Sequence, residues 1–313
     1  MTNRFFNKFV FIILVCLNQQ ARATEISPYF GVGNDIFNFT IESLGSNDST
    51  LRYEPNTPGL SRFGINAYGL GISYSARTGS ADLQAEKGYS DYFDFQINYH
   101  NKRWGADLYV QQYKGFFLQN TSDVGGTTDP YYLFPDVKFS HYGIMGRYAL
   151  SESNFSIAGL LNQSEEVKKT AGSYFIILGY RNYDLLTEQS IIPTVFQTLD
   201  NDMSNLRNLK VYSLNFGLGA GKYWVSDSKL FFGGVIDFVG TFAQYKYILT
   251  NEKRTADYGT LSPSLKIGLG YAGERWRTGL SVYTDTTTLQ GLNRSYIKPT
   301  ATSFFIYVRY MFN

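Results

Sequence analysis

The stretch SFFIYVRYMFN, residues Ser303–Asn313, decides the fold class. Successive side chains of a β-strand point to opposite sides of the sheet. With this period of two, one face is apolar and carries Phe304, Ile306, Val308, Tyr310 and Phe312, and the other carries Phe305, Tyr307, Arg309, Met311 and Asn313. A tilted strand of about 9–11 residues crosses the hydrocarbon layer of a bilayer. The stretch therefore predicts a membrane-spanning strand with one face suited to lipid.

The same alternation recurs along the chain. Leu214, Phe216 and Leu218, for example, alternate with small or polar residues. Comparable segments cover residues 89–100, 104–113, 141–148, 212–224, 261–271 and 276–283. Repeated two-residue alternation separated by turn residues is typical of membrane barrel strands. We therefore expect an all-β chain.

The composition excludes several classes. The chain has 28 Lys and Arg against 26 Asp and Glu, so no basic surface points to nucleic acid. Aromatic residues make up 17% of the chain. After residue 23 no run of about 18 apolar residues occurs, which argues against membrane helices. A soluble all-β domain and a membrane barrel remain.

The first residues are typical of a secretory signal peptide. Arg4 and Lys8 precede the apolar core Phe9–Leu17, and Ala21-Arg22-Ala23 supplies small residues for cleavage. We expect residues 1–23 to be removed and residues 24–313 to form one barrel domain. The single cysteine, Cys16, would leave with the signal, so we expect neither disulfides nor a Cys-ligated metal.

Aromatic residues at the strand ends favour the membrane barrel over a soluble sandwich. Amphipathic rings collect at the boundary between membrane and water. Seven rings lie on apolar faces beside the expected short turns or the chain end: Tyr99, Trp104, Tyr148, Trp224, Tyr271, Trp276 and Phe312. We predict that they form a membrane-interface girdle at the periplasmic rim.

The connections predict a closed antiparallel transmembrane β-barrel of about 14 strands, with 12 as the alternative. Short turns are expected near residues 56–61, 101–103, 151–154, 226–229 and 273–275, and long external loops near 78–87, 119–136, 193–208, 248–258 and 285–299. The count of 14 takes 155–163, 168–180 and 185–192 as three strands and places an N-terminal pair at 26–41 and 50–54. Even strand numbers are expected either way.

The inward faces are the candidate functional site. The predicted lumen-lining residues are Tyr92, Asp94, Gln96, Asp107, Tyr109, Tyr113, Arg147, Arg181, Asp237, Lys266, Arg277, Tyr283, Tyr307 and Arg309. These charges either pair across the lumen and close it or line a water-filled passage for small polar solutes. Inward glycines such as Gly217, Gly219 and Gly221 favour open volume, so the passive channel or transporter is the leading hypothesis. The alternative is a closed structural or surface-binding barrel that uses its long external loops.

Enzyme chemistry has little support. The two histidines are His100 and His141. Ser140 and His141 are neighbours on one strand and point to opposite faces, so they cannot act as nucleophile and base. An outer-membrane lipid hydrolase is therefore a remote alternative. We predict no catalytic residue, no metal site and no cofactor.

Four short motifs, YEPN at 53–56, EKGY at 86–89, YKGFF at 113–117 and KTAGS at 169–173, occur in this order. Together they resemble a domain-of-unknown-function family of Gram-negative outer-membrane β-barrel proteins. The final strand also resembles the closing strand of bacterial outer-membrane barrels, whose terminal aromatic is read by the barrel insertion machinery. The resemblance implies an outer-membrane location with that machinery, outer-membrane lipid and lipopolysaccharide as partners, and no particular mechanism.

Overall fold

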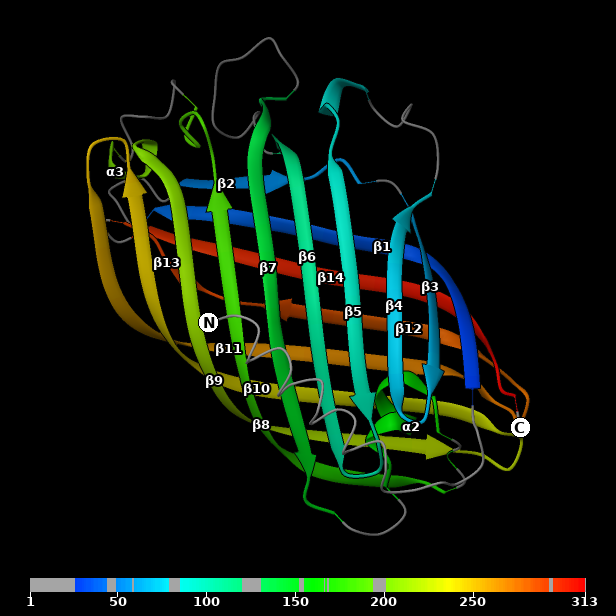
Figure 1. Cartoon of the computed structure of the whole chain (residues 1–313). Coiled ribbons are helices and arrows are strands. Elements are labelled where there is room, and N and C mark those ends of the chain that lie inside the picture. Colours follow the sequence, from blue (N-terminus) through cyan, green and yellow to red (C-terminus); the bar gives the residue numbers. More distant parts are fainter. Residues whose placement is uncertain are drawn as a thin grey trace, which may run out of the picture.

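The computed structural model describes residues 26–43, 49–57, 59–78, 85–119, 131–151, 155–165, 167, 169–193, 201–292 and 295–312. The signal peptide expected over residues 1–23 lies outside these ranges. The described chain forms one antiparallel sheet (Figure 1). Its strands are β1 (Ile26–Ser43), β2 (Ser49–Glu54), β3 (Leu60–Ala67), β4 (Leu70–Arg77), β5 (Asp91–His100), β6 (Trp104–Leu118), β7 (Leu133–Ala149), β8 (Ala171–Leu186), β9 (Leu206–Val225), β10 (Leu230–Leu249), β11 (Lys253–Ala272), β12 (Trp276–Thr286), β13 (Leu289–Gln290) and β14 (Ser295–Tyr310). The helices are η1 (Ala85–Lys87), α2 (Ile157–Asn162) and α3 (Asn201–Ser204).

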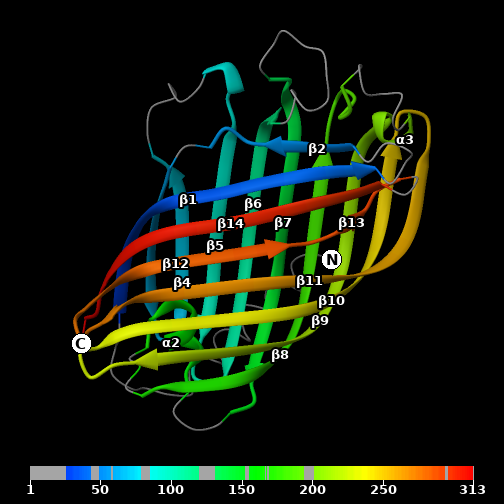
Figure 2. The ribbon, with the colours of Figure 1, turned by 180° about the vertical axis from the view of Figure 1, so that it is seen from behind.

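The sheet closes on itself into a barrel. β1 pairs with β14 from Tyr29↔Arg309 to Ser43↔Ser295, which joins the first and last strands. Twelve strands complete the ring, and the short β2 and β13 are additional. Figures 1 and 2 show the steep tilt of the strands around the barrel. Closure leaves no exposed sheet edge along the paired segments, as a membrane-spanning sheet requires.

The barrel has two different ends. We call the end with the short connections 68–69, 101–103, 226–229 and 273–275 the turn end, and the opposite end the loop end. Tyr68 and Gly69 both have positive φ, of 54° and 81°, in the two-residue turn between β3 and β4. Such backbone values suit the tight turns that join antiparallel strands.

Two sequence predictions about connections are wrong, and one turn was missed. Residues 56–61 do not form a turn between opposite strands, because β2 and β3 both run antiparallel to β1. The turn at Tyr68–Gly69 was not predicted. The long loop expected at 248–258 is a short turn, since β10 ends at Leu249 and β11 begins at Lys253.

The region 155–186 explains the difference between 12 and 14 ring strands. Residues expected as an ascending strand at 155–163 contain α2. One strand, β8, runs from Ala171 to Leu186 without the expected turn, and residues 187–192 are not in a strand. Residues 157, 160 and 161 are apolar at the helical spacing i, i+3, i+4 rather than at the spacing of two. Ser156 caps the helix by accepting the Gly159 N–H at 3.0 Å.

The predicted alternation of faces is confirmed on the outer wall. Leu218 is 67% exposed, and Phe304, Ile306 and Val308 are also exposed. Their neighbours Phe305 and Arg309 are buried. None of the helices in the described ranges is long and apolar enough to cross a membrane.

The interior consists of three layers. The turn-end core contains Met145, Phe155, Ile157, Leu160, Phe175, Ile177, Tyr223, Phe231 and Val235. The loop-end core contains Phe37, Phe39, Tyr53, Tyr113, Phe116, Leu118, Phe139, Leu209, Tyr245, Tyr247, Leu289 and Leu292. Between them lies a charged layer built mainly around Arg62, Arg147 and Arg181.

Candidate functional site

The predicted lumen residues lie inside the barrel at different depths. Asp94, Tyr113, Arg181, Asp237, Arg277 and Arg309 are buried, and Tyr92, Gln96, Asp107, Tyr109, Arg147, Lys266, Tyr283 and Tyr307 are partly buried. Tyr113 belongs to the loop-end core, where its ring stacks on Phe37 with centroids 4.3 Å apart. Most of the others make polar contacts in the charged layer or around α2.

The first cluster of the charged layer surrounds Arg62 on β3. Its Nη2 lies 3.1 Å from Asp94 Oδ2 and 3.4 Å from Asp35 Oδ2. The Tyr92 hydroxyl donates to Asp35 at 2.6 Å, and Gln96 Nε2 donates to Asp94 at 3.1 Å. Buried charges are stable only when they are paired and hydrogen-bonded. One cation and several donors therefore satisfy two carboxylates here.

The second cluster links strands separated by β8 and β9 through Arg147 on β7. Its Nη1 donates to Asp107 on β6 at 2.9 Å, and its Nη2 donates to Asp237 on β10 at 2.8 Å. His100 Nε2 lies 2.9 Å from the second oxygen of Asp107. His100, the last residue of β5, is buried. Arg147 thus bridges two aspartates that are far apart in sequence.

The third cluster joins β8 to β12. Arg181 Nη1 lies 3.2 Å from Asp285 Oδ2. His141 Nε2 shares a hydrogen bond of 2.9 Å with the Tyr109 hydroxyl, and its ring stacks on Tyr183 with centroids 4.3 Å apart. His141 is therefore a lumen residue. It is held between two tyrosines on neighbouring strands.

Lys266 and Arg277 hold the end of α2. Lys266 Nζ donates to the Leu161 carbonyl, and Arg277 Nη1 donates to the Gln163 carbonyl at 2.7 Å. The last carbonyls of a helix have no partner within the helix. Two inward cations from β11 and β12 supply that partner. The short helix is consequently anchored inside the turn end of the barrel (Figure 1).

Arg309 fastens the wall next to the first strand. Its Nη1 donates to Asn66 Oδ1 at 2.6 Å and to Ser27 Oγ at 2.8 Å. Its guanidinium lies 4.5 Å from the ring centroid of Tyr29. This cation connects β14, β1 and β3 through neutral groups and an aromatic face.

The inward glycines are filled rather than open. A Cβ on Gly219 would lie 2.2 Å from Asp237 Oδ1, and a Cβ on Gly221 would lie 2.6 Å from Leu160 Cδ2. The two glycines thus give room to a carboxylate of the charged layer and to a side chain of α2. The prediction that these glycines create free volume is wrong.

The loop-end core also contains a segment that leaves the wall. After β12, the Thr287 hydroxyl accepts from the Tyr183 hydroxyl at 3.0 Å, and Leu289 and Leu292 are buried among aromatic residues. The Tyr247 hydroxyl donates to the Gln290 carbonyl at 2.9 Å. This segment had been expected to be part of an external loop, yet it packs against the interior.

The predicted interface aromatics lie at the turn end. Trp104, Trp224, Tyr271, Trp276 and Phe312 are exposed, and Tyr99 and Tyr148 are half-buried. Neighbouring strands contribute pairs of rings, such as Trp104 with Tyr148 at 4.6 Å and Trp276 with Tyr310 at 4.7 Å between centroids. These positions match the rim at which interfacial rings are expected.

The sequence analysis missed three members of the charged layer. Asp35 and Arg62 lie on β1 and β3, whose faces were not assigned from the sequence, and Asp285 was placed in a loop. The signal was present for Arg62, because Phe63 and Ile65 are apolar at a spacing of two beside it. Among the residues that the structure describes, no group of three His, Cys, Asp or Glu could hold a metal ion.

Comparison with solved structures finds barrels of low sequence identity. The outer membrane protease OmpT of Escherichia coli is 9% identical, with 94% of this chain and 99% of that chain covered and a TM-score of 0.41. The β domain of the Bordetella autotransporter BrkA is 13% identical, with 91% and 98% covered and a TM-score of 0.34. The P. putida toluene transporter TodX is 10% identical, with 93% and 91% covered and a TM-score of 0.29.

These likenesses assign no activity, since identities and TM-scores are low. A comparison with curated protein sequences finds no match. A family model described as a domain of unknown function matches residues 26–312, which is nearly the whole described chain. It agrees with the resemblance that the four sequence motifs suggested. This transmembrane barrel therefore belongs to the family Domain of unknown function (DUF4421).

Proposed function

We propose that this protein is a closed outer-membrane barrel that presents a folded, water-exposed platform on the cell surface for binding a partner or for structural support. The filled interior is the observation that carries the proposal. Phe39, Leu118 and Val137 in the loop-end core have no exposed surface. Side chains that line a water-filled pore would remain accessible. At the turn end, α2 and its apolar neighbours occupy the same space.

Strand length supports the platform. β9, β10 and β11 have 20 residues each. Crossing the hydrocarbon layer takes about 9–11 residues. Roughly half of each strand therefore extends beyond that layer.

The outer wall changes character along these strands. On β10 the outward series is apolar up to Phe242 and continues with Gln244 and Lys246. On β11, followed from the turn end toward the loop end, the outward series is apolar as far as Leu261 and polar at Asp257. Above the turn-end core, the inward residues of β10 change in the opposite sense, from Asp237 in the charged layer to the aromatic rings of Tyr245 and Tyr247. Apolar inside and polar outside is the arrangement of a domain in water. The loop-end core thus stabilises a part of the barrel that stands above the membrane.

A passage for small polar solutes is the second candidate. The side chain of Asp107 is 33% exposed although it points into the barrel, which favours water within the charged layer. Passage through the barrel would require α2 and the segment around Leu289 to move. The platform proposal needs no such movement.

Planar bilayer recording separates the two candidates. We expect the folded protein to insert without discrete conductance steps, and heat-dependent gel mobility would verify folding. Reproducible conductance steps from the folded protein would refute the closed barrel and favour the passage.

Cysteine labelling tests the orientation of the platform. Thr255→Cys at the loop end should react with an impermeant maleimide on intact cells. Ser228→Cys at the turn end should react only after the outer membrane is permeabilised. The reverse pattern would contradict a surface platform at the loop end.

A further inference from the structure

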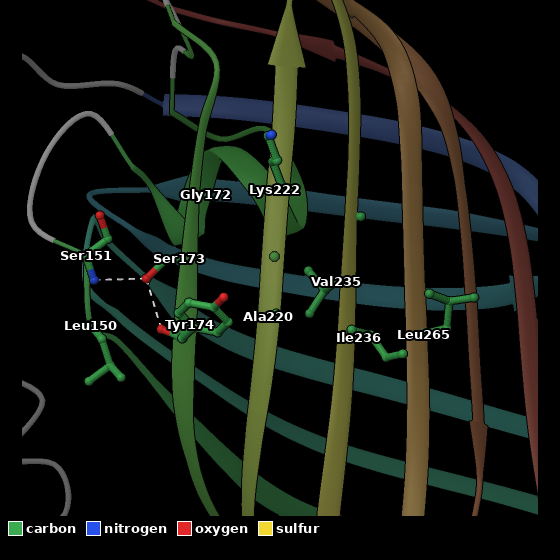
Figure 3. A pocket seen from close by; sticks show the side chains of 12 residues that line it. Leu150, Ser151, Gly172, Ser173, Tyr174, Ala220, Lys222, Val235, Ile236 and Leu265 are labelled. Atoms are coloured by element: carbon green, nitrogen blue, oxygen red, sulfur yellow. Dashed lines mark hydrogen bonds between the residues drawn. The ribbon is translucent and has the colours of Figure 1, made fainter.

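A groove crosses the outer wall of the barrel near the turn end. It has a volume of about 820 Å³ and lies across β8, β9, β10 and β11 (Figure 3). Ligand pockets commonly have about 300–1,000 Å³. Tyr174, Ile236 and Leu265 line it with exposed apolar surface. The groove therefore opens toward the membrane rather than the lumen.

Small residues in register create the groove. Gly172 on β8 and Gly234 on β10 both pair with Lys222 on β9, and Ala220 lies one outward position further toward the loop end. A Cβ on Gly234 would have one non-adjacent heavy atom within 4 Å, the Lys266 carbonyl oxygen at 3.6 Å. The outward-facing Lys222 is thus flanked on both neighbouring strands by glycines, whose missing side chains leave the groove.

Lys222 gives the groove a charged end. Its Nζ lies 5.0 Å from the ring centroid of Trp224, which belongs to the interface girdle. The side chain is exposed, and no ion pair joins it to a carboxylate of the described ranges. A cation on a lipid-facing wall is costly unless it reaches the interface or an anion. Its position complements an anionic headgroup at the rim.

We propose that this groove is a binding site for an anionic glycerophospholipid of the leaflet at the turn end. The lipid phosphate would lie at Lys222 between the two glycines. One acyl chain would follow Ala220 and Ile236 toward the membrane centre (Figure 3). The order of the groove, with the charge beside the aromatic rim and apolar surface further in, matches the order of headgroup and chain. Lipid binding in this outer groove does not depend on whether the lumen conducts.

Tryptophan quenching tests the site. In a Trp104→Phe/Trp276→Phe background, Trp224 is the reporter beside Lys222. The protein is reconstituted in phosphatidylcholine vesicles that contain increasing brominated phosphatidylglycerol, and quenching gives the binding constant relative to phosphatidylcholine. We expect a preference of about fivefold, the effect of one lysine on an anionic lipid. Brominated diacylglycerol, which lacks the phosphate, should show no preference.

Two variants and two matched controls locate the effect. Lys222→Gln should reduce the preference to about one, and Gly234→Leu should reduce it by filling the groove. Lys246 is the control for Lys222, because its Nζ lies 5.0 Å from the ring of Tyr212 on the same outer wall. Gly240 is the control for Gly234, because a Cβ there would meet the Phe216 carbonyl oxygen at 3.5 Å. Lys246→Gln and Gly240→Leu should retain the preference.

Three results would overturn the proposal. The first is a relative binding constant near one in the background protein. The second is an equal loss in Lys222→Gln and Lys246→Gln, which would indicate general surface charge. The third is full retention of the preference in Gly234→Leu. Heat-dependent gel mobility of every variant would establish that the barrel is folded in each measurement.

Discussion

Replacing Arg147 by glutamine tests whether the charged layer is a paired structure in which Asp237 is shielded from water. Arg147 on β7 bridges Asp107 on the neighbouring β6 and Asp237 on β10. Glutamine keeps much of the length of the side chain and removes its charge. If the interior is filled as described, losing the partner of Asp237 should destabilise the fold much more than losing the partner of Asp107, because Asp237 is shielded from water and Asp107 is not.

The burial of each aspartate gives the expected loss in the free energy of unfolding. The side chain of Asp237 is 2% exposed, and stranding such a buried charge costs about 3–5 kcal/mol. Asp107 is more accessible and lies 2.9 Å from His100, so its share is about 0–1 kcal/mol. Arg147→Gln should therefore lower the free energy of unfolding by about 3–5 kcal/mol. Asp237→Asn should cost about 1–3 kcal/mol, since it removes a charged hydrogen-bond partner while Arg147 keeps Asp107.

Urea unfolding of the vesicle-inserted protein, followed by tryptophan emission, measures these differences. Asp107→Asn should cost the least of the three variants. Arg52→Gln, on the exposed surface beside Gln119, is the control and should change stability by no more than about 0.5 kcal/mol. A loss below about 1 kcal/mol for Arg147→Gln, or equal losses for Asp107→Asn and Asp237→Asn, would show a water-filled layer. Either result would refute the reasoning for a closed interior.

Two further predictions concern the apolar layers. Leu160→Ala should lower the free energy of unfolding by about 2–5 kcal/mol, because it empties the space between α2 and Gly221. Leu230→Ala on the exposed wall is the control. Equal losses of stability in the two variants would contradict a packed turn-end core. Tyr53→Phe should cost about 1–3 kcal/mol, because the buried Tyr53 hydroxyl donates to the Ile191 carbonyl at 2.5 Å. The exposed Tyr68→Phe is its control, and an unchanged urea midpoint for Tyr53→Phe would show that this carbonyl is solvated.

The outer wall could be predicted from the sequence because lipid imposes one simple rule on it. Every second residue of a spanning strand must be apolar, so Phe304, Leu218 and Trp276 could be assigned from their neighbours in the chain alone. The same rule identified Asp94, Arg147 and Arg181 as inward residues. Side-chain direction in a strand is a local property, and local patterns report it well.

The contents of the lumen could not be predicted in the same way. Arg147 meets Asp237 across 90 positions in the sequence, and Tyr183 meets Thr287 across 104. Alternation shows that these residues point inward but not what they meet there. Helix α2 was missed for another reason. It is short, and its apolar spacing at residues 157, 160 and 161 lies in a chain otherwise dominated by strands.

The exchange of polarity along the strands also explains why the inward pattern was ambiguous. In the lipid-facing part of the barrel the outer residues are apolar, and the inner ones form both the charged layer and the turn-end core. Beyond the membrane the outer residues face water, so the inner ones can form an aromatic core. Tyr109 and Tyr113 lie on the same face of β6, yet Tyr109 bonds to His141 and Tyr113 stacks on Phe37. An inward tyrosine can thus belong to the polar charged layer in one part of a strand and to the aromatic core in another. The position along the strand, rather than the residue type, determines which of the two environments it has.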